Sequence, residues 1–307
     1  MKISNKNTNP IYLELKKLRL INNSFLTILC NKTRDKKIRV IKDLKSKIIF
    51  LEKYMTTNEY YASLKYKDDD RKFLEKPTKI TNIKTLTGNI KVPIIEDDLR
   101  RVNQFKNILK NKNVLDFGCG WGGFLRNIKN YKSLNGVELR KECIDHIQNN
   151  IKKINISNNI NSFEKKFDVI TAFHVIEHIP YQLKTIKILK SKLKPKGKII
   201  IEVPHAEDFL ILQDELKEFK AFTFWSEHLI LHTVKSLQTI LSKSGFKKIN
   251  IQFYQRYNFS NHLGWFLKRK PGGHNFYKKV INEELNYAYC ESLKKIGQTD
   301  TLIAIAE

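Results

Sequence analysis

The sequence predicts an α/β fold in which helices flank a doubly wound, mostly parallel sheet. Short apolar runs alternate with amphipathic helical patterns through most of the chain, which is typical of parallel strands joined by right-handed crossovers. The run at Asn111–Asp116 leads through a glycine-rich turn into a helix, the outline of a nucleotide site. A last apolar run, Asp300–Ala306, predicts a terminal strand.

An N-terminal extension is expected over residues 1–95. Its first part, Ile11–Leu29, is mixed and weakly helical. Two apolar runs, Ile38–Ile41 and Lys47–Leu51, then predict a short hairpin, because each is rich in residues that favour strands. A polar, aromatic segment follows, and its Tyr61 is a candidate to line a substrate site.

The core is expected over residues 96–255 together with residues 300–307. Amphipathic periodicity and capping residues predict its helices, and short apolar runs predict its strands. The helices are expected at Asp97–Leu109, Gly123–Asn130, Lys141–Lys152, Tyr181–Lys192 and Thr233–Ser244. The strands are expected at Asn111–Asp116, Ser133–Glu138, Lys153–Ile156, Phe167–Phe173, Lys198–Val203 and Lys247–Gln255, with a turn at Leu193–Gly197. Residues 256–299 are too many for a hairpin turn and predict an insertion that caps the pocket.

The glycine turn, residues 118–123, formally contains the G-x-G-x-x-G pattern of dinucleotide sites. Its glycines allow positive φ and let a ligand approach the backbone. However, Asp116 at the mouth of the turn would repel a diphosphate, which argues against a dinucleotide-dependent oxidoreductase. A carboxylate there suits a ligand that carries an ammonium group. An ordinary turn between a strand and a helix remains the alternative.

Three further stretches continue the pattern. The second strand ends in Glu138, about 20 residues after the turn, where a carboxylate can accept both hydroxyls of a ribose. Phe167-Asp168-Val169-Ile170 precedes the run from His174 to Pro180, and Leu193–Pro204 is a turn followed by a strand. Together with Asp-x-Gly-x-Gly at residues 116–120, these stretches resemble, in the same order, the motifs of the class I S-adenosylmethionine-dependent methyltransferases.

This resemblance covers roughly Asp97 to Pro204 and implies a Rossmann-like fold with an antiparallel C-terminal strand. It also implies S-adenosylmethionine as the cofactor. The cofactor contacts that it implies are Asp116, Gly118, Cys119, Gly120, Glu138, Leu139, Phe173 and His174, with Arg101 from the preceding helix. A solvated helix face is the alternative for Arg101, and Cys119 is expected to be a small residue beside the cofactor rather than a nucleophile.

His174, Glu177 and His178 form an H-x-x-E-H pattern, which formally matches inverted zinc proteases. That motif needs a continuous helix, and Pro180 predicts a break instead. The resemblance places Glu177 and His178 near the transferred methyl group. The resembling ubiquinone O-methyltransferases carry a related E-x-x-E-H stretch that is associated with a divalent metal. Since His174 replaces the first acid, a metal on these three residues is possible but not favoured, and a packed helix entry is the alternative.

His228 lies in the segment Trp225–His232, which ends just before a predicted helix at the carboxyl edge of the sheet. A neutral histidine can accept a hydroxyl proton as oxygen attacks a sulfonium methyl. We therefore expect His228, ahead of His178, to be the general base, with a capping or core histidine as the alternative.

The stretch Tyr257–His274 combines aromatic rings, amides and cations, which suit sugars or phosphates. It resembles the C-terminal part of methyltransferases found with bacterial surface-polysaccharide pathways. A sugar or nucleotide-sugar is therefore the preferred substrate; a quinone or phenol, RNA, and a nucleotide-binding module without catalysis remain alternatives. The candidate substrate contacts are Tyr61, Arg256, Asn261, His262, Lys270 and His274.

The formal net charge of +26 would suit a nucleic-acid partner. However, lysine is spread through the 307 residues among acids and apolar residues, so a solvated basic surface is the simpler interpretation. The four cysteines form no C-x-x-C pair, and no apolar stretch reaches the length of a membrane span. Because no apolar signal region follows Met1, a cytoplasmic protein is expected. The oligomeric state is left open.

Overall fold

The computed structural model describes residues 9–54, 79–85, 88–94, 96–277 and 281–307. The chain forms two compact units. Unit 1 comprises Met1–Thr56, His174–Lys190 and Ile201–Glu307, and unit 2 comprises Thr57–Phe173 and Ser191–Ile200. Each unit is described by itself below. The predicted domain boundaries at residues 95, 255 and 299 stay a prediction.

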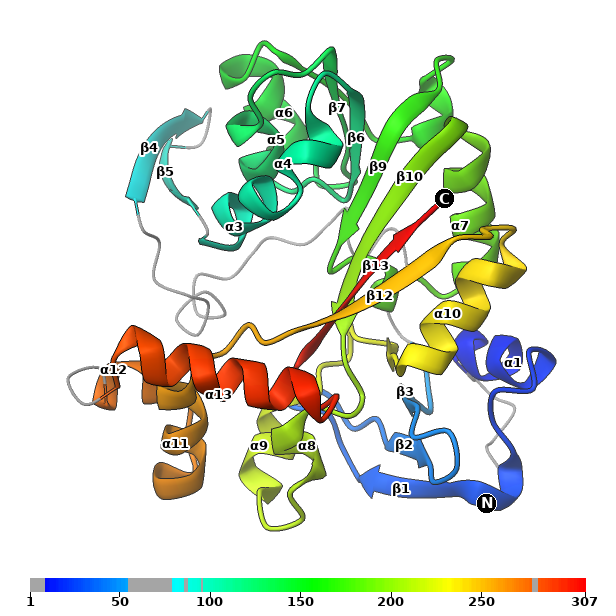
Figure 1. The fold of residues 1–307 in the computed structure, drawn as a ribbon, viewed down its shortest axis with the longest axis vertical. Coiled ribbons are helices and arrows are strands. Elements are labelled where there is room, and N and C mark those ends of the chain that lie inside the picture. Colours follow the sequence, from blue (N-terminus) through cyan, green and yellow to red (C-terminus); the bar gives the residue numbers. More distant parts are fainter. Residues whose placement is uncertain (1–8, 55–78, 86–87, 95, 278–280) are drawn as a thin grey trace. The chain divides into compact units, whose positions relative to one another are not determined.

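A seven-stranded sheet has the strand order β12-β13-β10-β9-β6-β7-β8 (Figure 1). Its strands are β6 Asn113–Phe117, β7 Ser133–Val137, β8 Ile154–Ser157, β9 Phe167–Phe173, β10 Leu193–Pro204, β12 Ile249–Tyr254 and β13 Thr301–Ala306. β6 pairs in parallel with β7 and β9, and β7 pairs in parallel with β8. β13 runs antiparallel to β12. The predicted fold class, with its antiparallel C-terminal strand, is confirmed.

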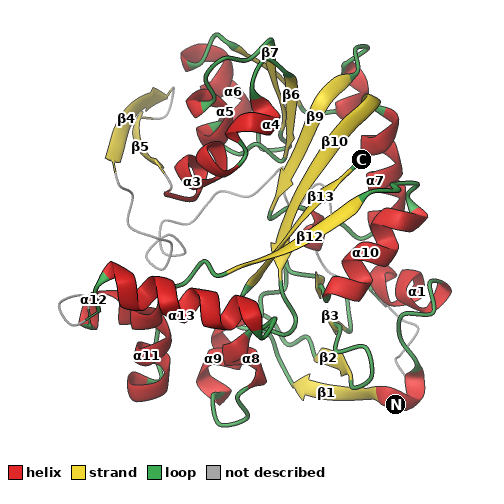
Figure 2. Ribbon diagram, in the orientation of Figure 1, coloured by secondary structure: helices red, strands yellow, loops and turns green. Residues whose placement is uncertain are grey.

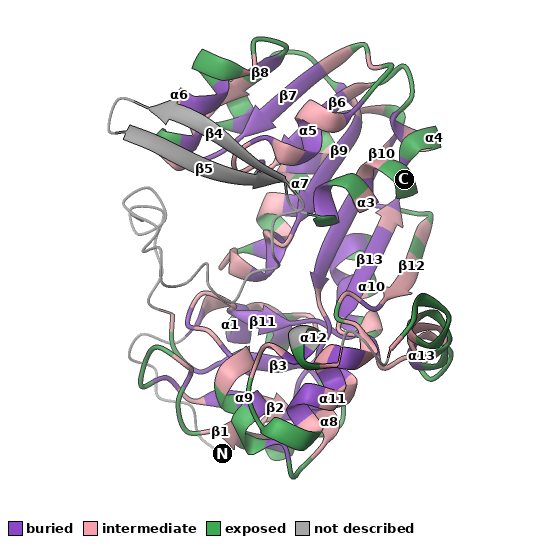
Figure 3. Ribbon diagram, turned by 90° about the vertical axis from the view of Figure 1, so that its left-hand side faces the viewer, coloured by how far each residue is buried: buried purple, intermediate pink, exposed green. Residues whose placement is uncertain are grey.

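Helices follow these strands along the chain (Figure 2). They are α5 Gly123–Asn127, α6 Lys141–Asn150, α7 Gln182–Ser191 and α10 Val234–Lys243. α10 begins with the expected cap, because the Thr233 hydroxyl accepts from the backbone of Ser236 and the Ser236 hydroxyl accepts in return. Gly245, at φ +97°, follows its end. The interiors of β9, β10 and β13 are buried (Figure 3).

Two expected elements differ from the structure. The helix expected over Asp97–Leu109 is broken into α3 Glu96–Gln104 and α4 Lys106–Leu109. Phe105 leaves the helix at the break because its ring is buried and stacks on Phe173, with 6.0 Å between the centroids. The turn expected at residues 193–197 is instead the first part of β10, with Lys196 in the left-handed region at φ +60°.

Unit 1 contains a second sheet, of order β1-β2-β3-β11. Its strands are β1 Leu26–Cys30, β2 Val40–Asp43, β3 Ile49–Leu51 and β11 Ile230–Leu231. β2 and β3 form the predicted hairpin, and α1 Pro10–Lys17 is the helical part of the weakly helical stretch. β1 and the pairing of β11 with β3 were not predicted. The apolar faces of these strands pack into one core with Leu229 and Trp265.

The remaining elements are mostly helical. They are α8 Phe209–Leu212, α9 Lys217–Thr223, α11 Phe259–Lys268, α12 Gly273–Phe276 and α13 Glu283–Lys295. α11 and α12 approach closely, since a Cβ on Gly264 would collide with the backbone of Gly273. In unit 2, β4 Lys79–Thr85 and β5 Gly88–Ile94 form an antiparallel hairpin. Among the residues that the structure describes, no helix combines the length and apolar character needed to cross a bilayer.

Candidate functional site

The glycine turn of unit 2 is held in a left-handed conformation. Gly118, Gly120 and Gly122 have φ values of +80°, +53° and +74°, which residues with a Cβ rarely adopt. The amides of Gly118 and Cys119 donate to the carbonyl of Val137 at 2.8 and 3.0 Å. The turn is therefore fixed to the end of β7, at the edge of the sheet where ligands of such folds bind.

Glu138, directly after β7, is buried and ionised. Its two carboxylate oxygens accept from the amides of Gly120 at 2.8 Å and Leu139 at 2.9 Å, and the Arg140 guanidinium lies 3.2 Å away. Burial raises the pKa of Glu138, but the charge and hydrogen bonds of Arg140 and the amide bonds outweigh it, so the pKa is lowered. A ribose hydroxyl bound here would replace some of the five hydrogen bonds that this carboxylate accepts from protein groups, and the exposed side chain of Leu139 offers apolar surface to the base.

Asp116, at the end of β6, is 4% exposed. Its Oδ1 accepts a 2.6 Å hydrogen bond from the Thr171 hydroxyl. Burial is the main cause that raises the pKa of Asp116 to about 7, and the hydrogen bond only partly offsets it. A carboxyl group in this state gains a favourable partner when a ligand places an ammonium group beside it.

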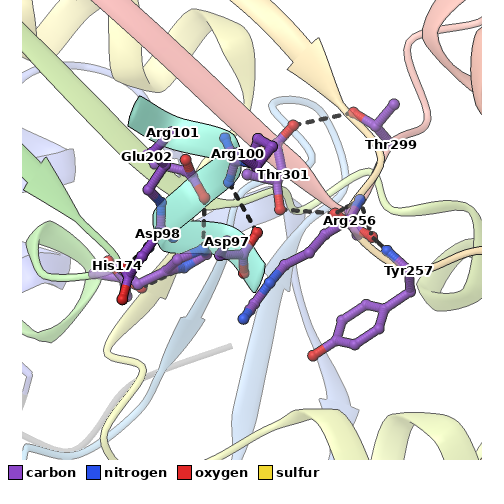
Figure 4. A network of polar contacts seen from close by, with 12 residues as sticks. Asp97, Asp98, Arg100, Arg101, His174, Glu202, Arg256, Tyr257, Thr299 and Thr301 are labelled. Carbon is purple, nitrogen blue, oxygen red and sulfur yellow. Dashed lines mark hydrogen bonds and ion pairs between the residues drawn. The ribbon is translucent and has the colours of Figure 1, made fainter. Parts of the chain in front are cut away.

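The helix α3 brings two ion pairs to the same unit. Arg100 pairs with Asp97 at 3.0 Å, and Arg101 lies 3.6 Å from Asp98 (Figure 4). The Arg101 guanidinium also lies over the ring of Phe173, 4.7 Å from its centroid. The two candidate cofactor residues Arg101 and Phe173 are therefore in contact.

These groups fit S-adenosylmethionine. A buried acid suits the ammonium group, an ionised acid suits the ribose, and Leu139 offers apolar surface. When bound, this cofactor supplies a methyl group on a sulfonium.

Cys119 is a packed, neutral thiol. It is 7% exposed, and its burial, with the nearby charges of Asp116 and Glu138, raises the pKa of the thiol well above its usual range. Its sulfur fills the space that a side chain at position 136 would need, since a Cβ on Gly136 would lie 2.6 Å from the Cys119 sulfur. This environment supports the expectation of a packed residue.

His174, in unit 1, directly follows Phe173 in the chain and lies between two buried acids. Its Nδ1 is 3.2 Å from the Glu177 carboxylate. Its Nε2 is 3.2 Å from the carboxylate of Glu202, and Figure 4 shows these two residues. Burial lowers the pKa of His174, but the hydrogen bonds to the two acids outweigh it, so the pKa is raised. A non-glycine residue at φ +53° further marks this position as constrained.

Glu202 was not predicted from the sequence as a site residue. A glutamate within the apolar run Lys198–Val203 is the signal that could have found it, because a fully buried acid in a central strand needs a partner.

Glu177, His178 and His228 come together in unit 1. Glu177 is fully buried, and although burial raises its pKa, the bond from His174 and the neighbouring imidazoles lower it to about 2. His178 Nε2 lies 3.8 Å from Glu177, and the rings of His178 and His228 meet edge to face at 4.9 Å. Burial, then the charge of His178, lowers the pKa of His228 to about 3, so its ring is neutral. Two histidines therefore share one buried anion.

The geometry bears on the metal alternatives. The possible ligand atoms of Glu177, His178 and His228 all lie within 4.8 Å of one another. The group thus includes His228 in place of His174, whose two ring nitrogens face acids. A short 3-10 turn over Ile176–His178 is followed by α7 from Gln182, so the continuous helix of a zinc protease is absent here, as Pro180 predicted.

The candidate substrate residues are dispersed. The charge of Arg256 lowers the pKa of both His174 and His228, and Asn261 is half-buried on α11. His262 is 1% exposed and contacts protein groups, Gln255 at 3.1 Å and the Tyr289 hydroxyl at 2.7 Å. Lys270 is exposed beside Phe276. Tyr61 and the side chain of His274 lie outside the described part of the chain.

The chain is similar to known proteins over part of its length. A ubiquinone biosynthesis O-methyltransferase from Coxiella burnetii is 34% identical over 101 residues, which are 30% of this chain and 43% of the relative. A tRNA U34 carboxymethyltransferase from Nautilia profundicola is 29% identical over 154 residues, 46% of this chain and 49% of the relative. The matches thus span less than half the length of each relative.

A solved structure shares the fold. A cyclopropane synthase from Mycobacterium tuberculosis superimposes with a TM-score of 0.51 at 16% identity, over 82% of this chain and 99% of that protein. A family model described as a methyltransferase domain matches residues 95–251, about half of the chain. The glycine turn, Asp116, Glu138 and the histidine segment all lie within that match. The chain therefore belongs to the methyltransferase domain family, the class I S-adenosylmethionine-dependent methyltransferases.

Proposed function

We propose that this protein transfers the methyl group of S-adenosylmethionine to a hydroxyl of a sugar or nucleotide-sugar in surface-polysaccharide biosynthesis, with His228 as the general base. The observation that carries the proposal is the pair of rings, His178 and His228, on the buried anion of Glu177. The pair lies in the chain segments that follow β9 and precede α10.

His228 is suited to receive the hydroxyl proton. Its ring is partly exposed and neutral, so a nitrogen lone pair can accept a hydrogen bond from the substrate. When bound, S-adenosylmethionine would supply the methyl group to the hydroxyl oxygen and leave as S-adenosylhomocysteine, and His228 would take the proton that the hydroxyl releases. The carboxylate of Glu177 favours the imidazolium that results and partly offsets its burial and the charge of His178, which disfavour it.

Arg256 is suited to hold an anionic part of the substrate. Its charge acts on His174 and His228, so a phosphate or carboxylate bound to its guanidinium would lie in the same unit as the base. This feature favours a nucleotide-sugar over a neutral sugar. Orientation of the hydroxyl by such a contact supplies much of the catalysis in a direct methyl transfer.

A quinone or phenol hydroxyl is the second candidate acceptor. The similarity to a ubiquinone biosynthesis O-methyltransferase favours it, although the match covers 43% of that relative. A neutral histidine next to an acid would serve a phenol hydroxyl equally well. An RNA acceptor draws support from the charge of +26 and from the similarity to a tRNA-modifying enzyme.

The test is transfer of labelled methyl from S-adenosylmethionine to a host extract that is then separated into sugar, lipid-quinone and nucleic-acid fractions. We expect label in the sugar fraction, and we expect His228→Ala to remove about 99% of the rate, in line with the loss of a general base. Gln238→Ala, at an exposed position on α10 in the same unit, serves as a control. Label confined to the lipid or nucleic-acid fraction contradicts the sugar proposal, and full activity of His228→Ala contradicts the assignment of the base.

A further inference from the structure

Contacts with the N-terminal segment, residues 9–54, hold the loop that carries His228. The family match begins at residue 95, so the family model gives residues 9–54 no role. Yet those residues belong to the same compact unit as the histidine cluster. Two sets of contacts join them to residues 222–231, which we call the His228 loop.

The first set of contacts holds the start of the loop. Asp35 accepts from the Ser226 amide at 3.0 Å and from the Ser226 hydroxyl at 2.5 Å. The neighbouring Arg34 amide donates to the carbonyl of Phe224 at 2.7 Å. The Arg34 guanidinium lies between the rings of Phe222 and Trp225, 4.2 Å from each centroid. This side of the loop is therefore fixed by hydrogen bonds and by a cation between two aromatic rings.

The second set of contacts holds the end of the loop through Asn9. Asn9 is fully buried, and its side-chain nitrogen donates to the carbonyls of Leu51 and Leu229, both at 3.0 Å. Its side-chain oxygen accepts from the amide of Ile11. Each hydrogen-bonding group of this side chain is thus used, and the amide joins α1, β3 and the loop at one point. The carbonyl of Leu229 also accepts a hydrogen bond from the Leu51 amide.

The His228 loop is also tied to the acid of the cluster. The amide of Leu229, the residue after His228, donates to the carbonyl of Glu177 at 2.9 Å. Because the backbone on both sides of His228 is fixed, its ring has little freedom to leave the ring of His178. Small displacements of a catalytic group lower rates strongly, since the reacting atoms must be aligned.

We propose that Asp35 and Asn9 are positioning residues, which hold the His228 loop so that the His228 ring stays against His178. The N-terminal segment is then part of the catalytic unit. The kinetic consequence rests on the proposed role of His228, whereas the geometric consequence does not.

The test compares Asp35→Ala and Asn9→Ala with the unmodified full chain by hydrogen–deuterium exchange and by methyl transfer. We expect the Leu229 amide to exchange at least about tenfold faster in both variants, because local opening exposes it. With the labelled acceptor fraction as substrate, we expect kcat to fall about 10- to 100-fold. We expect the KM for S-adenosylmethionine to stay unchanged, because the side chains of Asp35 and Asn9 bond to the His228 loop and its neighbours and not to the candidate cofactor residues. Asp35→Asn keeps an acceptor for the Ser226 amide and should restore most of the rate.

Asp43→Ala is the matched control. Asp43 lies in β2, in the same N-terminal segment as Asp35 and Asn9, and is 1% exposed. It accepts from the amides of Asn22 and Ser46, but in the described part of the chain it has no such bond to the His228 loop. We expect this variant to lose thermal stability while Leu229 exchange and kcat stay at the unmodified values, both measured well below the melting temperature.

Unchanged Leu229 exchange in Asp35→Ala and Asn9→Ala overturns the positioning role, as does an equal acceleration in Asp43→Ala. The two proposals fail separately. Faster exchange in Asp35→Ala, combined with full activity of His228→Ala, supports the positioning role of Asp35 and rejects His228 as the base.

Discussion

The hydroxyl of Thr171 on β9 donates a 2.6 Å hydrogen bond to the carboxylate of Asp116 on the neighbouring strand β6. Both residues are buried, and the bond alone does not compensate the carboxylate for its burial, so the pKa of Asp116 stands at about 7. The protein thus keeps a poorly solvated acid at the position where the ammonium group of the cofactor is expected. Stability and ligand binding make opposite demands on this side chain.

Replacement of Asp116 by asparagine separates these demands. The pKa of Asp116 is raised, so its contribution to stability is full below about pH 4 and is lost as the pH rises through about 7. Asp116→Asn avoids this loss. We expect it to raise the free energy of unfolding by about 1–2 kcal/mol at pH 8, with no gain near pH 4. We also expect weaker binding of S-adenosylmethionine, measured by calorimetry.

Asp168→Asn is the control for that variant. Asp168 begins the same strand as Thr171, but it pairs with Lys194 at 3.1 Å and accepts from Asn113, so its pKa is lowered. Here the loss of charge should reduce stability and leave cofactor affinity unchanged. A stabilising Asp168→Asn, or cofactor affinity that survives in Asp116→Asn, would contradict the interpretation of the two acids.

Cofactor binding should depend on pH. An ammonium group binds the ionised form of Asp116, so protonation of this carboxyl competes with the ligand. We expect the affinity for S-adenosylmethionine to fall about five- to tenfold from pH 7.5 to pH 6. The slope should be much smaller in Asp116→Asn. Titration calorimetry at several pH values measures both, and an identical slope in the two proteins would show that another group is responsible.

Gly136→Ala tests the contact between β7 and the glycine turn. The new methyl group would meet the Cys119 sulfur and the Ile156 side chain, which are already packed. We expect a loss of about 1–3 kcal/mol in the free energy of unfolding, measured with urea. Adding Cys119→Ala should recover part of it because the sulfur is gone. If the double variant is as unstable as the single one, the clash lies elsewhere.

His174→Ala tests the ion pairs in unit 1. Without the imidazole, the carboxylates of Glu177 and Glu202 remain buried without the ring nitrogens between them. We expect a loss of about 3–5 kcal/mol in the free energy of unfolding. Glu202→Gln in the same chain should recover part of this loss, since one buried charge disappears. A double-mutant cycle with urea gives the coupling energy, and a value near zero would mean that the pairs do not stabilise the fold.

The parts of the fold that the sequence predicted are those with local signals. β6, β7 and β9 are contiguous apolar runs between turn residues, and α10 carries its own cap. β11 has only two residues, and its pairing with Phe50 depends on a distant strand, so no local pattern could indicate it. The break at Phe105 was hidden for a similar reason, because its ring turns toward Phe173 on another element.

The candidate site shows the same limit. Asp116 and Glu138 are found at strand ends, where the order of elements determines their position. Glu202 gains its partner His174 only through the pairing of segments in the folded unit. His262 lies in a sequence rich in polar and aromatic residues, which predicted a ligand contact. In the structure, however, its ring nitrogens form hydrogen bonds with Gln255 and Tyr289 inside the protein. Polar composition cannot distinguish these two uses.

The bond from Asn9 to Leu229 joins residues 220 positions apart. During synthesis at about 5–20 residues per second, Asn9 and the strands β1–β3 leave the ribosome roughly 10–40 s before Leu229 and β11 are made. Over that interval, the apolar side chains of Ile48, Ile49 and Phe50 lack the part of their core that residues 206–231 and Trp265 supply in the finished protein. Slowed translation before β11 would prolong this exposure. The first 54 residues are therefore where we expect the nascent chain to depend most on chaperones.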